Sequence, residues 1–198
     1  GVGLWPKRKL VAVKAPVFSM SKLIGVDWYL GPEMKSTGEV MGIDYEFNSA
    51  LIKALMASNM TLVPNAVVLV SVADRDKHDA GKLVGKLLEA GCSIYATEGT
   101  ASMIRDMGEK VTLITKKLGQ GYPNVVDVIR EGTVSAVINT VSDSAKTLRD
   151  GFYIRRAAAE QRIPCYTSLD TANVAAESLL NSSENFNVES IDKYLNAK

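Results

Sequence analysis

The sequence contains few of the residues that build metal sites and disulfide frameworks. Its 198 residues include two cysteines, Cys92 and Cys165, and a single histidine, His78. Both cysteines lie in short apolar runs and neither belongs to a CxxC motif, which favours buried thiols over a disulfide or a zinc site. We therefore expect no bound metal and a reducing, cytoplasmic setting.

Long hydrophobic runs and an excess of one charge are also missing. No apolar run is long enough to span a bilayer, and the opening GVGLWPKRK lacks the apolar core of a signal peptide. The 23 basic and 22 acidic side chains give a net charge of +1. This balance gives no electrostatic reason to expect a nucleic acid or a membrane as partner, although it leaves room for a local anion site.

From about Asn65 onward, β-branched runs alternate with amphipathic segments of helical length. The expected strands are Ala66–Val72, Ser93–Ala96, Lys110–Thr115, Ser135–Asn139 and Ile163–Thr167. The expected helices are Arg75–Ala90, Gly99–Met107, Asn124–Arg130, Ser144–Gln161 and Thr171–Leu180. This alternation predicts an α/β fold with a five-stranded, mostly parallel sheet that carries helices on both faces.

The first 60 residues do not follow this pattern. Leu10–Lys14 predicts a strand and Tyr45–Ser58 a helix, and the glycine-rich stretch between them, which includes Gly25 and Gly42, predicts a loop. One strand and one helix cannot enclose a core of their own. We expect this segment to pack on the second part of the chain, on another copy or on protein outside it.

The most informative local motif is the run ATEGTA at positions 96–101, between an expected strand and an expected helix. Small residues at such a turn expose backbone N–H groups, and the helix N-terminus adds partial positive charge, as in phosphate-binding turns. The alternative is that Thr97 or Thr100 only caps the helix.

Other polar residues follow strands at the same edge, where ligands bind in open parallel sheets. Asn139 and Thr140 end the fourth strand, Lys77 begins the helix after the first, and Lys116 and Lys117 follow the third. A lysine in the first turn of a helix opposes the macrodipole, which suggests another use for it. We expect the amide, threonines and lysines to converge on one anion.

No catalytic arrangement is recognisable. Asp74 and Asp76 stand where helix N-caps are expected. Arg155 and Arg156 are expected either to pair with nearby acids such as Asp150 or to contact a phosphate or a neighbouring domain.

One run identifies a family. LGPEMKSTGEVMG at positions 30–42 resembles a segment near the end of the second ATP-grasp region of carbamoyl-phosphate synthase large subunits. VKAPVFS at 13–19 and IRRA at 154–157 fit the same family, so the resemblance covers nearly the whole chain. It implies that residues 1–60 are the C-terminal tail of that second ATP-grasp region, which forms carbamoyl phosphate. Residues 65–198 would then be an allosteric domain that shares its fold with methylglyoxal synthase.

The resemblance further implies a parent enzyme that uses two ATP to make carbamoyl phosphate from bicarbonate and ammonia. The implied partners are upstream ATP-grasp regions and a small subunit that releases the ammonia from glutamine, and homo-oligomerisation stays open. ATP and Mg (or Mn) would bind upstream of Gly1, which opens the sequence like a fragment of a longer polypeptide. We therefore expect no cofactor in this chain and no carbamoyl phosphate synthesis by it alone.

In family members that uridylate inhibits, the nucleotide phosphate occupies the sheet edge described above. The resemblance assigns phosphate binding to six residues of this sequence that match the family motif, and the position of Thr140 at the sheet edge adds it to the set. The residues assigned by motif are Lys77, Thr97, Gly99, Thr100, Lys116 and Asn139. Val141 stands at a position where family members commonly have a threonine. Ala15 stands where ornithine-activated members carry an acid, although Thr167 matches the family at a possible second effector site. An enzyme of pyrimidine synthesis, inhibited by a UMP-like effector, fits better than one linked to arginine.

Three alternatives are a true methylglyoxal synthase, the related purine cyclohydrolase domain and an interaction module without ligand. The first needs a carboxylate base after the third strand, where LGQGYPN at 118–124 has no acid. The second carries a downstream segment with histidine, which we do not find.

Overall fold

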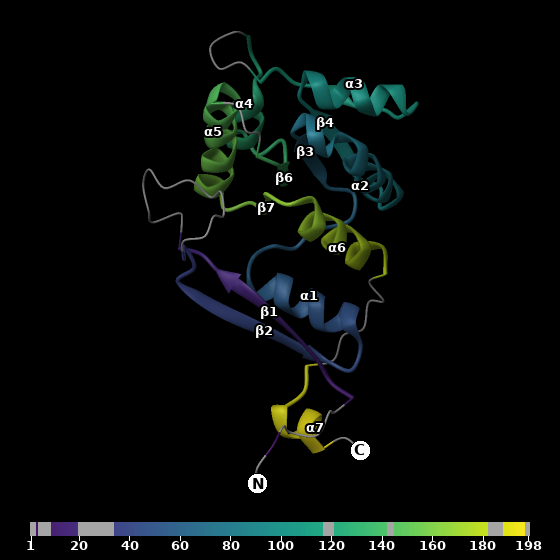
Figure 1. Ribbon diagram of the computed structural model, residues 1–198, viewed down its shortest axis with the longest axis vertical. Helices are drawn as coiled ribbons and strands as arrows, with labels where there is room; N and C mark the ends of the chain where they lie inside the picture. Colours follow the sequence, from purple (N-terminus) through teal and green to yellow (C-terminus); the bar gives the residue numbers. More distant parts are fainter. Residues whose placement is uncertain are drawn as a thin grey trace.

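The computed structural model describes residues 3, 9–19, 34–116, 121–141, 145–181 and 188–196, with no side chains for 145–148. Within these ranges a small unit of two strands and one helix lies against a larger α/β unit (Figure 1). Residues 30–33, which begin the motif at 30–42, and Lys117 lie outside the described residues.

The α/β unit is built on a five-stranded sheet in which every pairing is parallel. Its strands, in the spatial order β5-β4-β3-β6-β7, are β5 (Thr112–Leu113), β4 (Ser93–Ala96), β3 (Val67–Ser71), β6 (Ala136–Asn139) and β7 (Cys165–Tyr166). The predicted fold class is therefore confirmed. Strand order reverses around β3, which lies between β4 and β6, and this point is where ligands bind in open parallel sheets.

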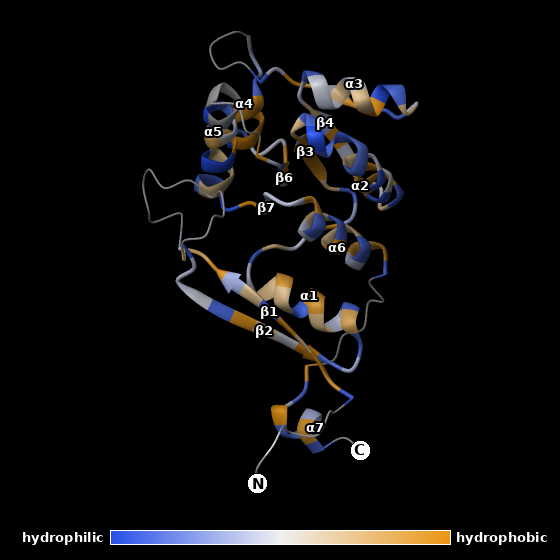
Figure 2. Ribbon diagram, in the orientation of Figure 1, coloured by the Kyte–Doolittle hydropathy of each residue, from blue (hydrophilic) through white to orange (hydrophobic). Residues whose placement is uncertain are grey.

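Helices cover both faces of this sheet because its strands are apolar on both sides (Figure 2). The helices are α2 (Lys77–Glu89), preceded by the short 3-10 helix η2 (Asp74–Asp76), α3 (Glu98–Asp106), α4 (Val125–Arg130), α5 (Ala145–Gln161) and α6 (Leu169–Leu180). Val68 and Val70 of β3 pack with α2, α3 and α6, whereas Leu69 packs with α4 and α5. Among the described helices, none is both long and apolar enough to cross a membrane.

The small unit corrects one sequence prediction. The stretch expected to be a loop contains a strand, β2 (Gly38–Asp44), that pairs antiparallel with β1 (Val11–Val17). Helix α1 (Phe47–Ala57) covers one face of this pair. Two glycines hid it, Gly38 at the start of β2 and Gly42 within it, since glycine is depleted in strands. At Gly42 the glycine has a packing reason, because a Cβ there would lie 1.9 Å from the carbonyl oxygen of Ala50 in α1.

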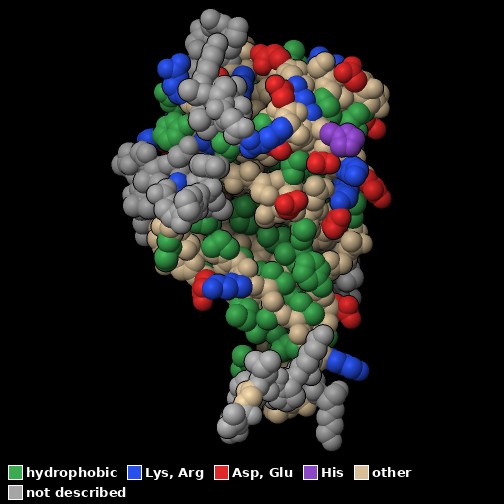
Figure 3. Space-filling view, viewed as in Figure 1, with side chains coloured by type: hydrophobic (Ala, Val, Ile, Leu, Met, Phe, Trp, Pro, Cys, Tyr) green, Lys and Arg blue, Asp and Glu red, His purple; other side chains and the backbone are tan. Residues whose placement is uncertain are grey.

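The small unit packs on the second part of the chain, the first of the three predicted alternatives. Leu51 and Leu55 of α1 belong to the same buried cluster as α2 and α6. From the C-terminal helix α7 (Ile191–Asn196), the hydroxyl of Tyr194 accepts a hydrogen bond from Lys53 at 2.8 Å. On the face shown in Figure 3, hydrophobic side chains gather over this half, and charged ones gather over the helices around the sheet.

Candidate functional site

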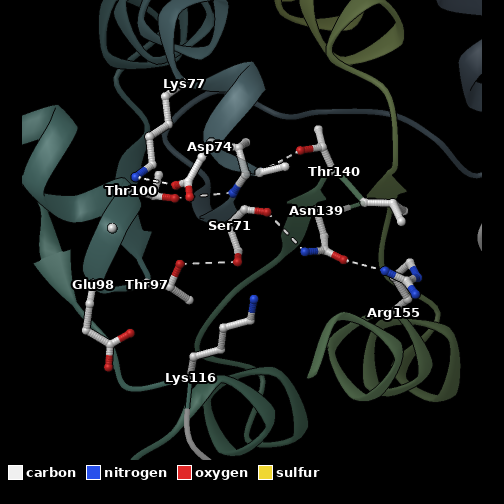
Figure 4. Close-up of a pocket in the computed structure, with 14 residues that line it drawn as sticks. Ser71, Asp74, Lys77, Thr97, Glu98, Thr100, Lys116, Asn139, Thr140 and Arg155 are labelled. Atoms are coloured by element: carbon white, nitrogen blue, oxygen red, sulfur yellow. Dashed lines mark hydrogen bonds and ion pairs between the residues drawn. The ribbon is translucent and has the colours of Figure 1, made fainter. Parts of the chain in front are cut away.

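A cavity of about 160 Å³ opens at the carboxyl ends of β3, β4 and β6 (Figure 4). Its lining is Ser71, Val72, Ala73, Asp74, Lys77, Thr97, Glu98, Gly99, Thr100, Lys116, Asn139, Thr140, Val141 and Arg155. All seven residues predicted for the anion site are among them. The fold therefore brings together the residues predicted from their places at the sheet edge and from the family motif.

The N-terminus of α3 forms one wall of this cavity. Thr97 occupies the N-cap position, but its side chain does not cap the helix; its hydroxyl donates to Oγ of Ser71 at 3.2 Å. The first backbone N–H groups of a helix have no intrahelical acceptor. With Gly99 in the lining, these donors and the positive end of the helix dipole lie beside the cavity. The capping alternative is wrong for Thr97.

Two buried hydroxyl groups are oriented by backbone N–H groups. Oγ1 of Thr100 accepts from the N–H of Val72 at 3.2 Å, and Oγ1 of Thr140 accepts from the N–H of Ala73 at 2.8 Å. A hydroxyl that accepts through a lone pair still has its own hydrogen to donate. Both threonines are therefore suited to donate to an anion in the cavity.

Lys77 lies across the N-terminus of α3. A Cβ at position 99 would lie 3.0 Å from its Nζ, so Gly99 provides the room for the ammonium. Lys77 Nζ also pairs with Oδ1 of Asp74 at 2.7 Å. This hydrogen bond lowers the pKa of Asp74. The prediction that Asp74 is a helix N-cap is wrong, because Asp74 is the first residue of η2 and Ala73 holds its N-cap position. Asp76 holds the N-cap position of α2, without a side-chain cap.

Lys116 is the second lysine of the cavity and is half-buried. Burial lowers its pKa, and the more distant carboxylates of Asp150 and Glu98 oppose this effect. Within the described parts of the chain, no carboxylate lies at ion-pair distance from its ammonium. A partly desolvated cation in a cavity favours an anion as its partner.

Seven lining residues were not in the set predicted for the anion site, and four of these have polar or charged side chains: Ser71, Asp74, Glu98 and Arg155. Ser71 ends β3, so the strand-end rule applied to every strand would have included it. Glu98 lies inside the ATEGTA motif at positions 96–101. Arg155 is only 1% exposed and donates to Oδ1 of Asn139 at 2.8 Å, whereas Arg156 pairs with Glu160 at 2.8 Å.

Thr167 is not part of this cavity. It lines a separate groove of about 760 Å³ between α2 and α6. Thr140 and Val141 line both spaces, and Arg75 donates to the carbonyl of Val141 at 2.8 Å. The position predicted for a second effector therefore adjoins the cavity without belonging to it.

We expect Asp74→Asn to tighten phosphate binding about two- to fivefold, because the carboxylate competes for Lys77 as an exposed ion pair that is weak and easily displaced. Isothermal titration of the chain with inorganic phosphate measures the effect. Asp79→Asn is the control, since it removes the same charge from the first turn of α2 outside the cavity lining. Unchanged affinity in Asp74→Asn, or an equal gain in both variants, would contradict competition at Lys77.

The fold and the cavity together define a class: an open parallel α/β domain with a donor-rich pocket where its strand order reverses. In agreement, residues 79–167 match the family described as the MGS-like domain. The chain is 51% identical over 192 residues to the carbamoyl phosphate synthase large chain of Thermomicrobium roseum, covering 97% of this chain and 18% of that protein. The chain is thus a relative of one part of carbamoyl phosphate synthase large chains and carries an MGS-like domain, as the sequence resemblance predicted.

The solved structure of methylglyoxal synthase from Elizabethkingia anophelis NUHP1 is also similar. The match has a TM-score of 0.43 and 18% identity, and covers 69% of this chain and 94% of that one. A likeness at this level carries no information about function.

Proposed function

We propose that this chain is the regulatory part of a glutamine-dependent carbamoyl-phosphate synthase and that its cavity binds the phosphate of a nucleotide effector such as UMP. The observation that carries the proposal is the convergence of two oriented hydroxyls, two lysines, an amide and a helix N-terminus on one cavity. These groups are the donors that phosphate oxygens require. The relation to the large chain supports the setting.

The size of the cavity favours a phosphate group over a whole buried nucleotide. Pockets that enclose small molecules usually measure about 300–1,000 Å³. At about 160 Å³ the cavity is smaller. In our proposal the phosphate enters it, while the nucleoside extends toward the opening.

Regulation then follows from linkage: the effector must bind the less active state of the enzyme more tightly than the active state. Such coupling is typically about 1–3 kcal/mol. We propose that its route crosses the contact between the two parts of the chain and that the stretch Met56–Pro64, which runs from the end of α1 toward β3, is the hinge. Tyr166, at the end of β7, donates to the carbonyl of Met60, and Leu62 is buried in the main cluster, so this stretch contacts the sheet.

In this proposal the chemistry lies elsewhere in the parent enzyme. ATP, Mg (or Mn) and bicarbonate would bind in the upstream ATP-grasp regions, and glutamine in the small subunit. Within the described residues, no group of three or more His, Cys, Asp or Glu side chains is placed to hold a metal ion.

Thr100→Ala in the full-length enzyme tests the regulatory role. We expect about ten- to hundredfold more nucleotide to be needed for the same response, since one hydrogen bond to a charged group is lost, with near-normal activity in its absence. Steady-state kinetics with and without UMP give both values. Thr112→Ala on β5, outside the cavity lining, is the control. An equal loss of regulation and unregulated activity would argue against a purely regulatory site.

Two further assays separate the alternatives. Titration of the chain with uridylate, inosinate and phosphate distinguishes an effector site from an interaction module, which would give no heat and no thermal shift at millimolar ligand. Because Asp74 and Glu98 place carboxylates on the cavity lining, production of methylglyoxal from dihydroxyacetone phosphate is also assayed. Turnover in that assay would replace the regulatory proposal with an enzymatic one.

A further inference from the structure

Two neighbours set the orientation of the Asn139 side-chain amide (Figure 4). Its Oδ1 accepts from Nη1 of Arg155 at 2.8 Å, and its Nδ2 donates to the carbonyl oxygen of Ser71 at 3.0 Å. A guanidinium can only donate and a carbonyl can only accept. A flipped amide would face both neighbours with the wrong group, so the chemistry of the neighbours fixes this orientation.

The orientation matters because Asn139 lines the anion cavity. Nδ2 carries two hydrogens, and one of them is used by Ser71. The amide therefore has a second N–H for a ligand, whereas the opposite orientation would turn a carbonyl oxygen toward an anion. By binding Oδ1, Arg155 orients the amide so that an N–H group and not the carbonyl oxygen is available to a ligand.

The position of Arg155 depends on a glycine in its own helix. Gly151 precedes it by one turn of α5, and a Cβ there would lie 2.7 Å from Arg155 Nη1 and 3.1 Å from Asn139 Oδ1. Any other residue at this position would therefore intrude on the hydrogen bond itself. Glycine in a helix interior is less favourable than alanine, and the room it leaves for the guanidinium accounts for its presence here.

We infer that Arg155 is a positioning residue of the anion cavity: it holds Asn139 so that the amide N–H is available to a phosphate oxygen, and Gly151 leaves the space for this contact. The inference rests on the proposed function and deepens it. Arg155 acts through Asn139, while Lys77 and Lys116 also bring positive charge to the cavity lining. The cavity is thereby set to accept a ligand group that only accepts hydrogen bonds, such as a phosphate dianion.

The test compares Gly151→Ala with Gly85→Ala in the 198-residue chain. Both glycines lie inside helices, but a Cβ at position 85 meets nothing within 4 Å. Isothermal titration with inorganic phosphate and with UMP is expected to show unchanged affinity for Gly85→Ala. For Gly151→Ala we expect an affinity about ten- to hundredfold lower, because the donor is displaced. An NMR spectrum of side-chain amides adds a direct readout: phosphate shifts the Asn139 resonance in the wild type and leaves it unshifted in Gly151→Ala.

Arg155→Lys keeps the test decisive if Gly151→Ala does not fold. Lysine preserves the positive charge but replaces the planar guanidinium by a compact ammonium on a different stem. A loss of affinity with retained charge supports positioning, and wild-type affinity in Arg155→Lys would overturn the inference. If the wild-type chain binds neither phosphate nor UMP, the proposed function fails and this inference fails with it. If the wild type binds and both variants bind equally well, only the inference fails.

Discussion

Replacing Lys116 by methionine is expected to weaken phosphate binding about ten- to hundredfold while making the ligand-free chain more stable. The loss of affinity reflects the removal of a charged donor from the cavity lining. The gain in stability arises because folding places this ammonium where burial disfavours its charge, as its lowered pKa indicates. Methionine has a similar length and no charge to desolvate. Titration calorimetry and thermal unfolding, each with and without phosphate, measure the two effects.

The opposite signs of these two effects separate a binding role from a structural one. Lys82→Met is the matched control, because Lys82 is an exposed lysine of α2 outside the cavity lining. It should leave phosphate affinity unchanged. A lower melting temperature for Lys116→Met, combined with an intact phosphate-induced stabilisation, would show that Lys116 supports the fold and not the ligand.

The same lysine determines the sign of a pH dependence. Burial holds the folded-state pKa of Lys116 below the ordinary lysine value of 10.5, which applies in the unfolded chain. At a pH between the folded-state and the unfolded-state pKa of Lys116, the unfolded chain holds a proton that the folded chain has released. The free energy of unfolding of the wild type therefore rises with pH relative to that of Lys116→Met. Bound phosphate favours the charged lysine and should reduce this difference. Paired denaturation curves measured across the alkaline range test it.

The sheet and its polar edge could be predicted because both depend on short-range patterns. Runs such as Val67–Ser71 and Ala136–Asn139 are continuous and apolar up to their last residue, as expected for strands buried on both faces. Once the strands are parallel, their carboxyl ends must meet at one edge, so polar residues that follow them share a site. This argument placed Lys77, Thr100 and Asn139 together without knowledge of any contact.

Pairings between side chains that are distant along the sequence could not be predicted. Arg155 lies 16 residues from Asn139 along the chain, and nothing in the sequence shows that α5 returns its guanidinium to the end of β6. Asp74 illustrates a competition between two roles: it stands near a helix start, where acids often cap, but Lys77 captures its carboxylate. Sequence spacing identifies which groups share a site, whereas their partners depend on packing.

Strand β2 was not predicted because Gly42 resembles a loop residue in the sequence, whereas in the structure it allows β2 to pack closely on α1. A substitution at Gly42 tests this explanation. We expect Gly42→Ala to destabilise the chain by about 4 kcal/mol or more, which is rare for a single substitution. The added Cβ would lie 1.9 Å from the Ala50 oxygen and 2.6 Å from the Ala54 nitrogen, both in the backbone of α1. A backbone neighbour cannot move aside as a flexible side chain can, so β2 and α1 must separate.

Gly38→Ala provides the control for Gly42→Ala within the same strand. A Cβ at position 38 meets nothing within 4 Å, so this variant should unfold at nearly the wild-type denaturant concentration. Equilibrium unfolding in urea gives the free energy of unfolding for both variants. Similar stabilities would mean that α1 does not rest directly on β2. A large difference would establish that glycine at position 42 serves close packing between strand and helix, although in the sequence it resembles a loop residue.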